Sequence, residues 1–329
     1  MTTRYFGEPI KRNEDGRLLT GQALFVDDVE LPGMLHAVFL RSHLAHARIA
    51  RLDATPALRR AGVIAVYTAG DLGDYWQPGP LLVPPPPVAG ITFNQRTQVP
   101  LAKDKVRHAG EPIAVVIAQS RYLAEDSLAD VVIELEPLPA VVDLERALTA
   151  GSPLVHNDVG SNVAARVRQT KGNYAVAVAA ASRVIRCRLR YDHGISSPME
   201  TRGVVAQWDP RANQLTVWDT TQAPVFIRNG LAGMLGLGER QVRVIAPFVG
   251  GGFGPKIMMF YRKRSCCRGR RSNSGGRSNG SRTAASISLP PPTSADRFTT
   301  PRSRSPVMER SSESRMCSCM IPAPTTRTG

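Results

Sequence analysis

The stretch QVRVIAPFVGGGFGPK, residues 241–256, joins a predicted strand to a glycine-rich loop. Residues 241–245 alternate polar and β-branched side chains, which is typical of a strand. The three glycines at 250–252 are costly in backbone entropy, so they are expected where the chain needs positive φ or a close approach. A strand that ends in such a loop presents several backbone N–H groups, which suits a phosphate or a polar heterocycle. The residues alone leave a tight turn without a ligand as an equal alternative.

This loop does not match the common nucleotide-binding motifs. Lys256 is not followed by Ser or Thr, and the glycine spacing differs from that of a Walker loop. The spacing also differs from the dinucleotide-binding pattern of a Rossmann fold. The two best-known phosphate loops are therefore excluded.

Working outward from the loop, the sequence predicts an α+β protein of two domains. Upstream of the loop, apolar spacing predicts a helix over 225–237, and strands are expected at 204–208 and 215–221. Residues 120–129 contain good helix formers after an N-terminal Ser. Further strands are expected at 23–26, 35–40, 63–67, 113–118 and 131–135. The first domain is expected to end near residues 150–155.

Charge is distributed unevenly along the 329 residues, which carry a formal net charge of +15. Residues 262–329 contain 14 basic and 3 acidic side chains, and the first 261 residues contain 28 basic and 24 acidic ones. A basic surface would ordinarily suggest nucleic acid as a partner. Because most of the excess lies in 262–329, a nucleic-acid partner is not expected for the remainder of the chain.

Cysteines divide in the same way. Only Cys187 lies in the first 261 residues, where its place in a strand-like run favours a structural thiol over a nucleophile. Cys266, Cys267, Cys317 and Cys319 do not have a zinc-binding spacing. One cysteine in the first 261 residues fits a reducing compartment, so a cytoplasmic location is expected. The sequence predicts no signal peptide and no membrane span.

Residues 262–329 lose the apolar periodicity of the preceding part and are rich in Ser, Arg and Pro. One interpretation is a basic, disordered tail. A sharper hypothesis is a reading-frame slip in a GC-rich gene. Synonymous codons for the last eleven residues, read in a neighbouring frame, spell HDSGAYDPYG, and the residues directly after Tyr261 spell PEEVLLPW. These restored segments resemble globular protein, so a frameshift after Tyr261 is expected.

Several motifs together carry a family resemblance. The opening residues GEPIKR at 7–12 and LPGMLH at 31–36 are two of them, and VRHAGEPIA at 106–114 is a third. PMETRG at 198–203 and the glycine loop complete the set. Residues 4–261 thus resemble the N-terminal part of the large, molybdenum-binding subunit of the xanthine dehydrogenase, aldehyde oxidase and aerobic carbon monoxide dehydrogenase family, closest to the carbon monoxide dehydrogenase branch.

The resemblance implies an oxidoreductase that inserts a water-derived oxygen into a small-molecule substrate. The reaction would take place at a molybdopterin cofactor, for which the cytosine dinucleotide form is one option in the family. Gln222 resembles the family glutamine that hydrogen-bonds an oxygen on molybdenum, a role that suits an uncharged amide. Gly251, Gly252, Phe253 and Gly254 resemble the loop that approaches the cofactor. The cofactor's own sulfurs hold the metal, so no direct protein ligand is expected. For Phe253, packing in the hydrophobic core stays open as an alternative to a place beside the cofactor.

The resemblance also implies a domain organisation. It comprises a lead-in segment (1–16), an a/b hammerhead domain (17–142), a linker (143–159), a truncated first molybdopterin-binding domain (160–261) and the basic tail (262–329). The second molybdopterin domain and the general-base glutamate of the family have no counterpart in the tail. An iron–sulfur subunit and an FAD subunit are the implied partners. We therefore expect an incomplete enzyme that is inactive alone and does not retain its cofactor.

Three further interpretations stay open. The chain could be a repurposed binding protein whose basic tail contacts nucleic acid. It could be one half of a split subunit that a second chain completes. Within PMETRG, Glu200 and Arg202 could form a buried pair at a domain boundary or contact the cofactor.

Overall fold

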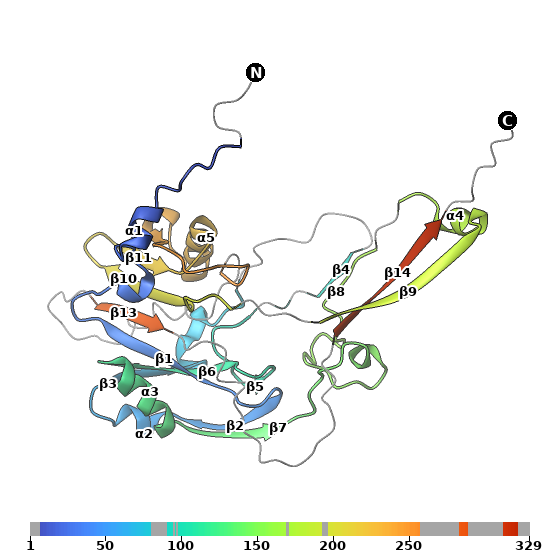
Figure 1. Cartoon of the computed structure of the whole chain (residues 1–329). Coiled ribbons are helices and arrows are strands. Elements are labelled where there is room, and N and C mark those ends of the chain that lie inside the picture. Colours follow the sequence, from blue (N-terminus) through green and yellow to red (C-terminus); the bar gives the residue numbers. More distant parts are fainter. Residues whose placement is uncertain are drawn as a thin grey trace, which may run out of the picture.

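The structure is a computed structural model of the whole chain (Figure 1). It describes residues 7–79, 91–94, 96, 98–168, 171–192 and 197–256, together with two strands at 283–288 and 312–321. Helices and strands both contribute to the fold, which confirms the predicted α+β class.

A seven-stranded sheet forms the centre of the protein, with the strand order β12-β11-β10-β13-β1-β6-β3. Its strands are β1 (Leu35–Arg41), β3 (Val63–Thr68), β6 (Pro112–Ala118), β10 (Gly203–Asp209), β11 (Gln214–Asp219), β12 (Val242–Ile245) and β13 (Thr283–Ser288). β6 pairs antiparallel with both β1 and β3, and β10 pairs antiparallel with β11. β12 runs parallel to β11, so the glycine loop leaves the sheet at its β12 edge.

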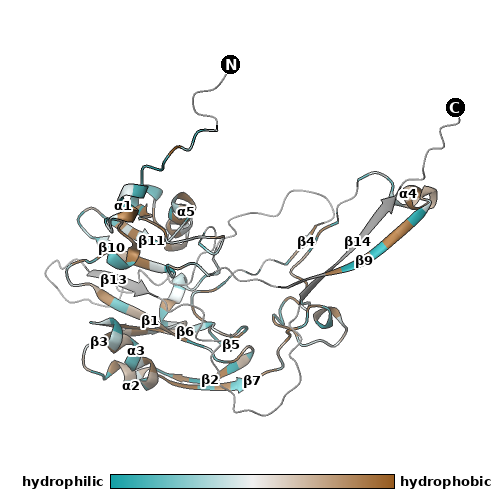
Figure 2. Ribbon diagram, in the orientation of Figure 1, coloured by the Kyte–Doolittle hydropathy of each residue, from teal (hydrophilic) through white to brown (hydrophobic). Residues whose placement is uncertain are grey.

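Burial explains why some of these strands are continuously apolar. Five consecutive residues of β6, Pro112–Val116, are buried because the strand lies between two neighbours and is covered on both faces. β1 has three buried residues at its centre, and Figure 2 shows hydrophobic colour along it. The core therefore accounts for the strands predicted at 35–40 and 113–118.

A second, smaller sheet supports the N-terminal half. It has the order β5-β2-β7, formed by β2 (Ala47–Asp53), β5 (Lys105–Val106) and β7 (Val132–Pro137). β6 and β7, which flank the predicted helix at 120–129, lie in different sheets. That helix is α3 (Arg121–Asp126), followed by a 3-10 turn, η3 (Ser127–Asp130). Ser120 caps α3, since its Oγ accepts a hydrogen bond from the Leu123 N–H at 3.2 Å.

One α-helix covers the sheet of the second half. α5 (Pro224–Leu235) begins with proline at its first position and ends at Gly236, which adopts a left-handed φ of 61°. Ile227, Leu231 and Leu235 are buried in one cluster that includes Phe39 and Leu101 of the N-terminal half. The two halves therefore share a hydrophobic core. The helix predicted over 225–237 ends two residues earlier in the structure, at Leu235.

The remaining elements are short or lie to one side of this body. The other helices are α1 (Asp15–Leu19), α2 (Thr55–Leu58) and α4 (Tyr174–Ala180), with 3-10 turns η1 (Val26–Asp28), η2 (Gly70–Tyr75), η4 (Arg146–Leu148) and η5 (Glu239–Gln241). β4 (Thr92–Phe93) pairs with β8 (Ala165–Arg166), and β9 (Arg183–Asp192) pairs antiparallel with β14 (Ser312–Ile321). Figure 1 shows the β9–β14 ribbon projecting away from the main sheet.

Two predictions differ from the structure. The strand expected at 23–26 does not form, because the Asp28 carboxylate accepts from the Phe25 N–H at 2.8 Å and starts the turn η1. In the tail, β13 pairs with both β1 and β10, and β14 pairs with β9. Backbone pairing requires no particular side chains, which explains how segments without apolar periodicity extend these sheets. The rest of the tail predicted to be disordered lies outside the described residues.

Candidate functional site

The glycine loop follows β12 and takes a conformation that few residues tolerate. Gly251 and Gly254 both have a φ of 92°, and Phe253 between them has a φ of 46°. Asn213 is the other non-glycine residue with positive φ in the described part of the chain. A bulky side chain in the left-handed region is strained, and such strain persists where surrounding contacts impose it.

Gln222 lies directly against the loop and makes two of these contacts. Its N–H donates to the Lys256 carbonyl at 3.0 Å, and its Oε1 accepts from the Gly254 N–H at 3.3 Å. A Cβ at Gly252 would lie 2.2 Å from Cδ of Gln222, so a side chain there would displace the Gln222 amide. The structure therefore brings Gln222, Gly252 and Gly254 together.

Phe253 and Gly251 occupy the outer part of the same loop. Phe253 is 69% exposed, so its side chain is not part of the core. Its ring folds back over Gly251, where an added Cβ would lie 2.8 Å from Phe253 Cε2. Met199 is 96% exposed, and Val225 and Phe226 at the start of α5 are exposed as well. These apolar side chains, which neighbour Glu200 and Gln222 in the sequence, are thus left uncovered by the described residues.

A buried ion pair lies at the base of the loop. Lys256 Nζ donates to Glu200 Oε2 at 2.9 Å, and the Lys256 side chain is fully buried. The sequence left open a Glu200–Arg202 pair or a cofactor contact, and the structure shows that Glu200 pairs with Lys256. Sequence reasoning missed Lys256, although a lysine directly after a glycine loop was a usable signal.

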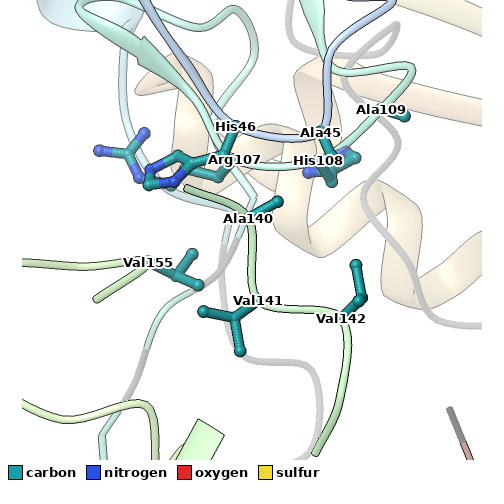
Figure 3. A pocket seen from close by; sticks show the side chains of 9 residues that line it. All are labelled: Ala45, His46, Arg107, His108, Ala109, Ala140, Val141, Val142 and Val155. Atoms are coloured by element: carbon teal, nitrogen blue, oxygen red, sulfur yellow. The ribbon is translucent and has the colours of Figure 1, made fainter. Parts of the chain in front are cut away.

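A cavity in the described part of the chain lies away from the glycine loop (Figure 3). It measures about 190 Å³ and is lined by Ala45, His46, Arg107, His108, Ala109, Ala140, Val141, Val142 and Val155. His46 Nδ1 donates to the Pro139 carbonyl at 2.7 Å, which fixes the ring. Nearby, burial lowers the pKa of His156, and the Arg107 charge lowers it further. Small apolar side chains form most of this wall, and none of its residues belongs to the glycine loop.

The described ranges contain no group of three or more His, Cys, Asp or Glu side chains that could hold a metal ion. Within those ranges, no helix is both long and apolar enough to cross a membrane.

Comparison with known families places two domains in succession along the chain. Residues 20–139 match the aldehyde oxidase and xanthine dehydrogenase a/b hammerhead domain. Residues 155–268 match a molybdopterin cofactor-binding domain, which includes Gln222 and the whole glycine loop.

Individual relatives agree with these matches. The chain is 35% identical over 267 residues to the nicotine 6-hydroxylase large subunit of Paenarthrobacter nicotinovorans, covering 79% of this chain and 31% of the relative. It is 38% identical over 261 residues to the carbon monoxide dehydrogenase large chain of Afipia carboxidovorans, covering 75% of this chain and 31% of the relative.

Solved structures give the same result. Carbon monoxide dehydrogenase from Oligotropha carboxidovorans matches with a TM-score of 0.71 and 33% identity, over 86% of this chain and 35% of that one. Quinoline 2-oxidoreductase from Pseudomonas putida 86 matches with a TM-score of 0.71 and 33% identity, over 84% of this chain and 34% of that one. The chain thus spans about a third of the length of these relatives. It belongs to the xanthine dehydrogenase and aldehyde oxidase family, with which it shares the a/b hammerhead domain and a molybdopterin cofactor-binding domain.

Proposed function

We propose that this chain supplies one wall of a molybdopterin site in a molybdenum hydroxylase large subunit. The observation that carries the proposal is the cradle at Gly252, where the loop lies so close to Gln222 that an added Cβ would displace the Gln222 amide. A backbone this bare allows a flat heterocycle to approach its N–H groups. When bound, the cofactor would supply two-electron oxidation with an oxygen derived from water.

The residues of the chain would hold and orient that group. Gln222 Oε1 is engaged by the Gly254 N–H, and its Nε2 makes no hydrogen bond to the described residues, which leaves a donor available. An amide carries no charge and does not titrate, so it would orient a polar atom at any working pH. Gly251, Gly252 and Gly254 would admit the ligand, and the exposed Phe253 ring would shield one side of it from water.

The partners and the exact cofactor form also belong to this proposal. The relatives are named large subunits or large chains, which implies complexes of several subunits. We propose an iron–sulfur subunit and an FAD subunit as electron acceptors, a cytosine dinucleotide form of the cofactor, and a cytoplasmic location. The substrate is a small molecule, whose identity depends on residues outside the matched third.

A chimera tests the wall directly. Residues 1–256 of this chain would replace the matched third of the carbon monoxide dehydrogenase large chain, and the purified protein would be assayed for bound molybdenum and pterin. We expect cofactor to be retained by the chimera. We expect it to be lost by the matched Gly252→Ala chimera, because the added Cβ must displace Gln222. Equal retention by both chimeras would contradict the proposed role of the loop.

The chain alone is expected to behave differently. Since it spans about a third of its relatives, the other walls of a cofactor pocket would come from sequence it does not match. The 329-residue protein, expressed in a host that makes molybdopterin, should contain no stoichiometric molybdenum and should not reduce an acceptor dye. A complete carbon monoxide dehydrogenase purified in parallel is the positive control. Stoichiometric molybdenum in the chain alone would overturn this expectation.

A further inference from the structure

One carboxylate ties both ends of the glycine loop together. Glu200 Oε2 accepts from the Gly250 N–H at 2.8 Å and from Lys256 Nζ at 2.9 Å. The Glu200 N–H in turn donates to the Gly250 carbonyl at 3.1 Å. We propose that the Glu200–Lys256 ion pair is a clamp that positions the loop and Gln222 for the cofactor, which makes both residues positioning residues.

The clamp is connected to Gln222 through the backbone of Lys256. The Lys256 carbonyl accepts from the Gln222 N–H at 3.0 Å and from the Thr221 hydroxyl at 3.2 Å. The Lys256 side chain therefore fastens the loop to Glu200, while its main chain fastens the loop to the end of β11. A displacement of Lys256 would therefore displace Gln222 and disturb the hydrogen bond that Gln222 Oε1 accepts from the Gly254 N–H.

Space is as restricted at the clamp as at the cradle. A Cβ at Gly250 would lie 2.5 Å from Cβ of Glu200, so the two chain segments are in direct contact. The strained Phe253, with a φ of 46°, lies between the two fastened ends. A strained backbone is retained where its surroundings over-determine it, and two fastened ends do so.

Burial of this pair is costly, which points to a role beyond stability. The Lys256 side chain is 0% exposed and that of Glu200 is 12% exposed. Glu200 Oε1 is buried and has no hydrogen-bond partner among the described residues. Well-packed apolar side chains often replace such a pair without loss of stability. A conformation that only this pair specifies would explain its presence.

This inference rests on the proposed function for its purpose, but its test needs no cofactor. In the full chain, Glu200→Met/Lys256→Met removes both charges and retains side-chain length. Amide hydrogen exchange would be measured at the Gln222 N–H, whose acceptor is a backbone carbonyl that neither substitution removes. Amides of Val205 and Val217 in β10 and β11 are internal controls, and thermal unfolding reports global stability.

If the pair acts as a clamp, the double variant should have a melting temperature close to that of the wild type. The hydrogen-exchange rate of the Gln222 amide should then rise at least tenfold, while the rates of the control amides change less than twofold. A pair that only contributes stability predicts unchanged exchange at Gln222, which would overturn the proposal. If the double variant does not fold, Glu200→Gln gives the same readout, because it keeps the shape of the carboxylate and loses the ion pair.

The wild-type chain supplies an independent check. Acylation of Lys256 should be at least tenfold slower than acylation of the exposed Lys171, since the amine is buried and paired. Equal rates would overturn the clamp. If the loop is protected from hydrogen exchange in a chimera that binds no molybdopterin, the proposed function is rejected while the clamp is retained. The failure of the proposed function and the failure of the clamp are therefore distinguishable.

Discussion

Phe253 shows at the scale of one residue how backbone conformation limits the choice of side chain. It has a φ of 46° and is 69% exposed, so packing contributes little to its stability. Left-handed backbone costs about 1–2 kcal/mol for most L-residues, and asparagine adopts it more readily. We expect Phe253→Val to be less stable than Phe253→Asn by about 1–2 kcal/mol, measured by urea unfolding. Equal stabilities would show that the loop relaxes to another conformation.

His36 gives a pH dependence whose sign follows from its environment. Burial lowers the pKa of His36 below its usual 6.5, and the charge of Arg121 lowers it further. The unfolded chain therefore binds a proton at His36 more readily than the folded chain. The free energy of unfolding is thus highest above about pH 6.5 and falls as the pH decreases below that value. The unfolding midpoint should drop between pH 7 and 5.5, and His36→Gln should reduce that drop. An identical pH profile in the variant would contradict the assignment.

Single residues also show what the sequence could indicate. The bare glycines predicted a loop of close approach, and the cradle at Gly252 agrees with that interpretation. Glu200 and Lys256 lie 56 positions apart in the sequence, so the local pattern of residues around either one does not predict their ion pair. The functional roles of Gln222 and Phe253 came from the family resemblance and remain proposals.

α5 allows the energetics of one element to be tested in opposite directions. Leu231 is fully buried against the sheet, so Leu231→Ala should reduce the free energy of unfolding by about 2–5 kcal/mol. Gly233 lies in the same helix, and a Cβ added there would meet nothing within 4 Å. Gly233→Ala should therefore stabilise the protein by about 0.5–1 kcal/mol. Chemical denaturation of both variants measures the two changes.

Among the elements, burial decided which predictions were correct. Strands with continuous apolar runs, such as β6, and the helix α5 with its apolar face were found at the expected positions. β2 was missed, because ARIARLD combines isolated apolar residues with exposed charges that pair across to β7. The segment at 23–26 reads as a strand, yet Leu24 and Phe25 contact Phe248 ahead of the glycine loop. Such long-range contacts are invisible to local periodicity.

At the scale of the whole molecule, the two halves are not independent. Residues of β1 and of α5 share one hydrophobic cluster, and β13 joins β1 to β10 in a single sheet. The predicted boundaries at 17–142 and 160–261 stay predictions, and the family matches at 20–139 and 155–268 give separate limits. A substitution in one half should therefore alter the stability of the other.

The tail presents a different problem, since its composition departs from the rest. It carries 14 basic and 3 acidic residues, against 28 and 24 in the 261 residues before it. The relatives named above match 75% and 79% of the chain, and the molybdopterin-domain match ends at residue 268. Recognisable similarity thus stops near the point where apolar periodicity is lost. A basic tail selected for nucleic-acid binding would not explain why the loss of similarity and the loss of apolar periodicity fall at nearly the same place.

A reading-frame slip close to Tyr261 explains both changes, because one displaced base replaces every later residue while leaving the earlier ones intact. We propose this origin for residues 262–329 and expect the DNA, resequenced through the Tyr261 codon, to contain a single-base slip. Restoring the frame should give alternating apolar segments and the PEEVLLPW-like text directly after Tyr261, continuing as a large subunit of this family. A neighbouring open frame with its own start would instead indicate a split subunit. If no one-base change yields a long open frame, the tail is a true sequence and the frameshift is rejected.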